Sequence, residues 1–320
     1  MRIIYLIFIL FYSCELLFPP GVYEKLKFDS YGQFLDPMVS CGNKHSMILK
    51  SDGTLWATGF NSSGQLGTGD NISLSGFTLV SSDVKYVACG YDFTFIIKKD
   101  GSLWATGLNV NHQLGTNDDP GITSTNSFFK VSDDVRFVAT CFTYSFFISN
   151  NNSLYVTGAN TWENVNFSEF TFVNNDIKFV SCGFYHTMII SNDGSLWATG
   201  YNIDGQLGLN DNSSRDSFQF VTNNVKQVSS GYNHTMVLLN NGTLLAAGLN
   251  NNGQLGTGDE FNRNSLIKVA DNVKFVSSGD KFTIIIKNDN SVWATGDNSD
   301  GQLGMSGFNS TYTFVKVLEL

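Results

Sequence analysis

One short segment recurs six times along this 320-residue chain, and its spacing limits the folds open to it. It reads Ser-Leu-Trp-Ala-Thr-Gly at 102–107, and variants of it stand at 54–59, 153–158, 195–200, 243–248 and 291–296. Its third position holds Trp56, Trp104, Tyr155, Trp197, Leu245 and Trp293, in steps of 48, 51, 42, 48 and 48 residues. Repeats of this length are supersecondary units that bury their apolar faces against neighbouring copies.

Each unit carries the pattern of four short strands. In the second unit we expect them at residues 77–80, 85–89, 94–98 and 102–106. The last two are joined by Asp100 and Gly101, a pair that favours the positive φ of a tight hairpin. Both faces of the strands are apolar, as Phe95, Ile96 and Ile97 show, so each sheet must be covered on two sides. Stacked four-stranded sheets with this period predict a β-propeller.

The two ends of the chain set the expected number of blades. The first unit begins at Met38 without an initial strand, and residues 313–320 supply a matching strand after the sixth unit. We therefore predict that Thr313–Leu318 pairs beside Val39–Cys41 and closes the ring. The expected fold is all-β, a six-bladed β-propeller of four-stranded antiparallel blades over residues 38–320.

Residues 1–14 have a different pattern from the repeats. Arg2 is followed by the apolar run Ile3–Tyr12 and then by Cys14, which predicts a secretory signal peptide or a lipoprotein leader with Cys14 acylated. The run is shorter than the roughly 20 residues that a spanning helix needs. We expect residues 15–37 to be a tether, and the protein to be secreted or anchored to the cell envelope, with membrane contact only through the lipid. The alternative is a cytoplasmic protein with an apolar N-terminus.

Composition narrows the function classes. The chain has 19 Lys and Arg against 28 Asp and Glu, a net charge of −9. A protein that holds a phosphate backbone needs clustered basic residues, so we expect no nucleic-acid partner. Four histidines and five cysteines without a C-x-x-C pair leave little for a metal site with several ligands. We therefore expect no metal and no cofactor.

Histidine and cysteine recur at fixed places in the repeat, which indicates packing roles. Three histidines share a position that holds Phe or Tyr in the other units: His45, His186 and His234. We expect their rings to pack and their nitrogens to bond to a local backbone group, rather than to act as ligands, acids or bases. Three cysteines share a position that elsewhere holds Ser or Thr: Cys41, Cys89 and Cys182. Equivalent positions on separate blades seldom lie within about 7 Å, so free buried thiols are expected. Cys141 lies one residue outside this register.

The repeats resemble the regulator of chromosome condensation repeat family, whose signature is a Leu-Trp-x-x-Gly strand followed by Asn-x-x-Gly-Gln-Leu-Gly. The second part stands at 61–67, 109–115 with His112 in place of the first Gly, 202–208, 250–256 and 298–304. The resemblance implies a platform for protein partners. Some members promote nucleotide exchange on a small GTPase, and others bind chromatin, membranes or foreign enzymes. The best-known members have seven blades, and their exchange wedge and basic N-terminal tail have no counterpart here.

The third unit departs most from the others. Residues 161–167 replace the Gly-Gln-Leu-Gly loop and bring in aromatic side chains. Exposed aromatic residues often anchor protein interfaces, so we predict a partner-binding site formed by Trp162, Glu163, Phe167 and Phe170. The alternative is that Trp162 and Phe167 fold inward and fill the space of the missing loop.

These patterns favour a non-catalytic, monomeric interaction scaffold that binds a protein partner through loops on one propeller face. The sequence does not identify this partner. The alternative is an intracellular guanine-nucleotide exchange factor for a small GTPase. An enzyme is the third class: propellers that hydrolyse glycans use clustered carboxylates or Tyr, and no unit here gains such a group.

Overall fold

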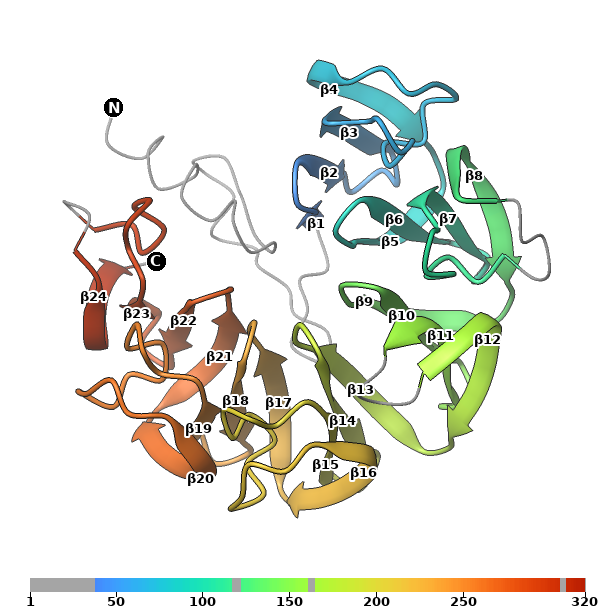
Figure 1. Ribbon diagram of the computed structural model, residues 1–320. Helices are drawn as coiled ribbons and strands as arrows, with labels where there is room; N and C mark the ends of the chain where they lie inside the picture. The colour runs from blue at the N-terminus through green and yellow to red at the C-terminus, as the bar shows by residue number, and fades with distance from the viewer. Residues whose placement is uncertain (1–37, 117–121, 161–164, 306–308, 320) are drawn as a thin grey trace.

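The computed structural model describes residues 38–116, 122–160, 165–305 and 309–319. Within these ranges the chain forms 24 strands and no helix, and the strands make six antiparallel four-stranded sheets. Each sheet consists of four consecutive strands. Figure 1 shows the sheets following one another around an arc in chain order. The predicted all-β fold with six four-stranded blades is confirmed.

Blades one to three have the following strands. The first blade contains β1 (Met38–Cys41), β2 (His45–Leu49), β3 (Leu55–Gly59) and β4 (Leu74–Ser81). The second contains β5 (Val84–Cys89), β6 (Phe93–Lys98), β7 (Leu103–Leu108) and β8 (Ser124–Ser132). The third contains β9 (Val135–Thr140), β10 (Tyr144–Ser149), β11 (Leu154–Asn160) and β12 (Val165–Asn174).

Blades four to six repeat this order. The fourth contains β13 (Ile177–Cys182), β14 (His186–Ser191), β15 (Leu196–Gly200) and β16 (Arg215–Thr222). The fifth contains β17 (Val225–Ser230), β18 (His234–Leu239), β19 (Leu244–Gly248) and β20 (Arg263–Ala270). The sixth contains β21 (Val273–Ser278), β22 (Phe282–Lys287), β23 (Ser291–Gly296) and β24 (Thr311–Glu319).

The structure divides the repeat into blades differently from the prediction. β4 pairs with β3 in the first blade, and β5 begins the second, although their residues were expected in one sheet. At the other end β24 pairs with β23, which corrects the predicted pairing of Thr313–Leu318 beside Val39–Cys41. The link between β4 and β5 is only Ser82 and Asp83, so in the sequence it resembles a hairpin. In the structure this link, in which Asp83 has a φ of 57°, carries the chain to the next sheet.

The apolar core is divided among the interfaces between successive blades. Between the first two blades, Met47 and Leu55 pack against Val87 and Ile96, and all four are fully buried. The first strand of every blade lies toward the centre, where the six strands line a cavity of about 250 Å³. Among the described residues no blade packs after the sixth, and Ile284, at the position of Met47, is only half-buried. In Figure 1 the first and last blades stand apart at the ends of the arc.

The Asn-x-x-Gly-Gln-Leu-Gly segments, called repeat loops below, follow the third strand of a blade and reach the next blade. Gln65 Nε2 donates to a carboxylate oxygen of Asp92 (3.1 Å), and Thr94 Oγ1 donates to the Gln65 carbonyl (2.8 Å). Thr235 and Thr283 make the same 2.8 Å bond to the loops of the fourth and fifth blades. These loops therefore fasten neighbouring blades to each other.

Candidate functional site

The interface between the third and fourth blades is built without a repeat loop. β11 and β12 are connected by residues 161–164, which lie outside the described residues. On the fourth blade, Thr187 stands at the position of Thr94, and its hydroxyl bonds to Tyr144 Oη at 3.1 Å. Thr199 donates to the carbonyl of Arg215 within its own blade at 3.0 Å. Both bonds have counterparts at other interfaces, as between His45 and Thr94 and between Thr106 and the carbonyl of Thr125, so they add nothing in place of the repeat loop.

A disulfide joins the same two blades. Cys141, between β9 and β10, is bonded to Cys182 at the end of β13, with the Cα atoms 5.4 Å apart. The expectation of a thiol is therefore wrong for Cys182, whereas Cys41 and Cys89 are buried cysteines outside the disulfide, as predicted. The pairing is possible because Cys141 lies in the strand connection that faces the next blade, one residue beyond the shared cysteine position.

The four residues predicted to bind a partner have different surroundings. Trp162 and Glu163 lie outside the described residues. Phe167 is half-buried and packs against the core between the third and fourth blades, as the inward alternative expects. Phe170 points the other way, toward the second blade, where its ring meets that of Phe95 with centroids 6.1 Å apart. Within the third blade it contacts Phe147, with centroids 4.7 Å apart. Cys14, the predicted lipidation site, also lies outside the described residues.

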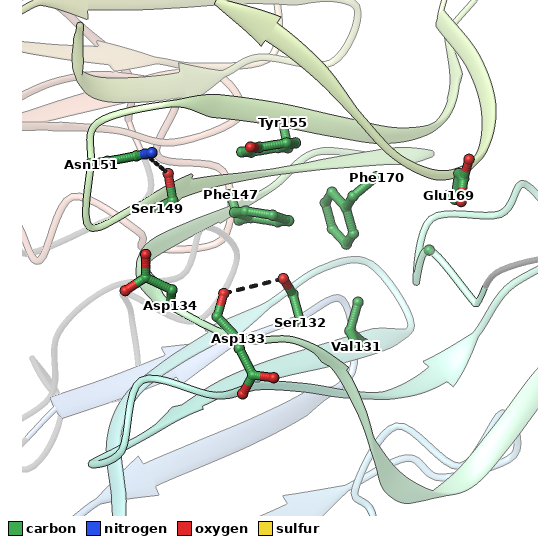
Figure 2. A pocket seen from close by; sticks show the side chains of 11 residues that line it. Val131, Ser132, Asp133, Asp134, Phe147, Ser149, Asn151, Tyr155, Glu169 and Phe170 are labelled. Atoms are coloured by element: carbon green, nitrogen blue, oxygen red, sulfur yellow. Dashed lines mark hydrogen bonds between the residues drawn. The ribbon is translucent and has the colours of Figure 1, made fainter. Parts of the chain in front are cut away.

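A cavity of about 320 Å³ opens beside Phe170, between the second and third blades. Figure 2 shows three rings gathered along it, those of Phe147, Tyr155 and Phe170. Phe147 and Tyr155 are stacked with their centroids 4.7 Å apart. Gly115 of the second repeat loop supports Phe170, since a Cβ atom there would come within 2.6 Å of its ring. The loop thus fixes one wall of the cavity.

Carboxylates surround these rings. Asp133 and Asp134 follow β8, and Glu169 lies on β12; Figure 2 shows the last two on opposite sides of the ring cluster. Asp133 pairs with Lys130 at 2.7 Å on the exposed surface. Among the described residues neither Asp134 nor Glu169 forms an ion pair. The cavity therefore combines aromatic faces with unpaired negative charge, a combination suited to binding cations.

The three repeated histidines are buried and bonded across blade interfaces. Nε2 of His45, His186 and His234 lies 2.9, 3.0 and 3.1 Å from the hydroxyl of a threonine on the next blade. Burial lowers the pKa of His45 to about 4 and the pKa of both His186 and His234 to about 3. The predicted packing role is supported, although the bonding partners are threonine side chains rather than backbone groups.

Two features of this region, the disulfide and the cavity beside Phe170, were not predicted from the sequence. The repeat had a signal for each: Cys141 stands where other units place glycine, and Ser149 stands where three units place lysine.

Within the described ranges, no group of three or more His, Cys, Asp or Glu could hold a metal ion. A search of the same ranges finds no helix with the length and hydropathy to cross a membrane.

Comparison with known families matches the repeats directly. The regulator of chromosome condensation (RCC1) repeat matches residues 39–65, 84–113, 177–206, 225–254 and 273–302. A second description of the same repeat matches 193–238 and 241–286. Together these matches span more than half of the chain, and the third unit has none.

Solved structures share the propeller fold at low sequence identity. Prp20p from Saccharomyces cerevisiae, described with its binding properties to Gsp1p and histones, is 15% identical, with a TM-score of 0.76 over 88% of this chain and 76% of its own. Human WBSCR16 is 19% identical, with a TM-score of 0.77 over 87% of this chain and 81% of its own. The ectodomain of the Arabidopsis thaliana receptor kinase ACR4 has a TM-score of 0.50 and 12% identity, over 81% and 78%.

Proposed function

This chain belongs to the regulator of chromosome condensation (RCC1) repeat family, and from that premise we propose that it is a non-catalytic, monomeric scaffold that binds a protein partner. The third blade would supply the contact. One observation carries the proposal: the third blade has no repeat loop, and its fourth strand β12 lines a cavity with Phe170 and leaves Phe172 exposed. Exposed aromatic residues beside a cavity are typical of interface anchors.

Replacing Phe170 tests the proposed contact. Leu266 occupies the same position in the fifth blade, so Phe170→Leu should leave the blade folded while it removes one aromatic wall. We expect a pull-down of the native partner to fall at least about fivefold, as for an interface anchor worth more than 1 kcal/mol. Phe218→Leu makes the same change at the fourth blade and should retain the partner. Equal recovery by the two variants would refute the third-blade contact.

We further propose that the protein is secreted or anchored to the cell envelope. The disulfide supports an oxidising compartment, because disulfides rarely persist in the cytosol. Mass spectrometry of the native protein should then find residues 1–13 removed with a lipid on Cys14, or a leader cleaved nearby. An intact, unmodified Met1–Cys14 segment in the cytoplasm would overturn this location.

The alternative function is nucleotide exchange on a small GTPase inside the cell. The likeness to Prp20p, whose description includes binding to Gsp1p, is its support. A nucleotide-release assay across a panel of small GTPases separates the two proposals. We expect no acceleration of release, and catalysed release from one GTPase would replace the scaffold proposal.

A further inference from the structure

Three blades place a lysine over the indole of the repeated tryptophan. Lys50 Nζ lies 4.0 Å from the ring centroid of Trp56 in the first blade. The corresponding distances are 4.7 Å for Lys98 and Trp104, and 4.1 Å for Lys287 and Trp293. In each case the lysine follows by two residues the strand position paired with the tryptophan. The repeat therefore contains a standard place for an ammonium group on an aromatic face.

In the third blade that place has no lysine. Tyr155 stands at the tryptophan position and pairs with Phe147, so the lysine position falls on Ser149. The Ser149 hydroxyl is bonded to Asn151 and to the carbonyl of Ser153, and its side chain is too short to cover the ring. The cavity beside Phe170 is lined by both Ser149 and Tyr155. It therefore includes the location where other blades hold their own ammonium group.

The charges around this cavity complement a cation. Asp134 and Glu169 contribute two carboxylates, and the carboxylate of Asp133 is shared with Lys130. We propose that the cavity between the second and third blades binds the ammonium group of a lysine side chain presented by the protein partner. The ligand lysine would rest on the aromatic wall as Lys50, Lys98 and Lys287 do within their own blades. This inference rests on the proposed scaffold function and names the chemistry of its contact.

The fourth blade shows why the site is specific to the third. Ser191 stands at its lysine position, and Trp197 packs against the core between blades and meets Phe220 edge-on at 5.5 Å, as Tyr155 meets Phe172 at 5.9 Å. The difference between the two blades lies in the charge beside the ring. Ser217 occupies the place that Glu169 has on β12. The fourth blade therefore lacks this carboxylate, and a substitution there is a matched control.

Two small probes test the site without the partner. N-acetyl-lysine methylamide carries the ammonium group, and N-acetyl-norleucine methylamide has the same aliphatic chain without it. We expect the lysine probe to shift the aromatic NMR signals of Tyr155 and Phe170 saturably, with a dissociation constant on the order of millimolar. The norleucine probe should bind at least about tenfold more weakly. Equal shifts from the two probes would overturn the proposal.

Variants that place a lysine in the cavity, or remove a negative charge from it, test the proposal further. Ser149→Lys should place an internal ammonium group on Tyr155, as in the other blades, and abolish probe binding. Ser191→Lys, at the same position of the fourth blade, should bind the probe like the wild type. Glu169→Gln changes an exposed side chain and should weaken binding several-fold even if Ser149→Lys fails to fold. Wild-type binding by Glu169→Gln and by a folded Ser149→Lys would contradict the site.

The results of these experiments distinguish the lysine site from the proposed partner contact on which it rests. If the lysine probe binds selectively but Phe170→Leu retains the partner, the cation site stands and the proposed third-blade contact fails. If Phe170→Leu loses the partner but the two probes bind alike, the contact stands and the lysine inference fails.

Discussion

Lowering the pH from 7 to 5 is expected to reduce the free energy of unfolding by about 6 kcal/mol, because three histidines are buried in the neutral form. In an unfolded chain the pKa of histidine is about 6.5. Burial lowers the folded pKa of His45 to about 4 and that of His186 and His234 to about 3. At pH 5 the unfolded chain binds protons that the folded protein does not, and each histidine costs about 2 kcal/mol.

The sign of this effect follows from the depressed pKa values. The histidine contribution to stability is complete above pH 6.5 and is lost as the pH falls toward the folded pKa values of about 4 and 3. The structure supplies the cause: Nδ1 of all three rings is buried without a hydrogen-bond partner. A protonated ring would therefore hold an uncompensated charge between two blades. Urea unfolding followed by tryptophan fluorescence at a series of pH values measures the loss.

Phenylalanine substitutions distinguish the contribution of the histidines to this pH dependence from that of other titrating groups. Phe93 and Phe282 already occupy this position in two blades, so His186→Phe with His234→Phe should fold. Thr235 and Thr283 keep their bonds to the repeat-loop carbonyls in this variant. The stability lost between pH 7 and 5 should shrink to about 2 kcal/mol, the contribution of His45. An unchanged loss in the variant would show that other groups cause it.

Removing the disulfide is the second change with a large expected effect. The bond closes a segment of 41 residues across an interface that has no repeat loop, and the loop-closure estimate for that separation is about 4 kcal/mol. The sibling blades supply the replacement residues. Gly42, Gly90 and Gly183 occupy the position of Cys141, and Ser230 occupies that of Cys182. Cys141→Gly with Cys182→Ser should therefore lower the free energy of unfolding by roughly 2–4 kcal/mol without a clash.

A reductant and a buried free cysteine provide the controls. Dithiothreitol should destabilise the wild type to about the level of the double variant and leave that variant unchanged. Cys89→Ser replaces a free thiol at the position of Cys182 and should cost less than about 1 kcal/mol, because Ser278 makes the equivalent contact to the preceding blade. A wild type that dithiothreitol does not affect would contradict the structural role of the bond.

The repeat made the blades predictable, because identical apolar patterns must bury identical faces. It did not fix where one blade ends. Ser82 and Asp83 have the length of a hairpin, and only the pairing of β4 with β3 shows that they cross to the next sheet. The disulfide was missed for a related reason. Sequence comparison aligned Cys182 with its equivalents on other blades, whereas the bond depends on how close Cys141 comes across the interface.

The site was located by its departure from the repeat, but its chemistry was not. Phe170 was predicted as an exposed anchor, and in the structure it forms a cavity wall against the second blade. Phe147 and Tyr155 line the cavity beside it, residues 131–134 of the second blade form the other side, and the open space depends on the serine at 149. Aligning the units by strand register, rather than by loop motif alone, would have shown a missing lysine at that position.

Photo-crosslinking most directly tests whether a protein partner contacts the third blade. Phe172 and Phe220 occupy the same strand position in the third and fourth blades and are 51% and 50% exposed. p-Benzoylphenylalanine at either position should preserve the fold, because an exposed aromatic residue is already present. In the native organism we expect a defined crosslinked product from position 172 and none from 220. The same product from both positions, or from 220 alone, would contradict the assignment of binding to the third blade.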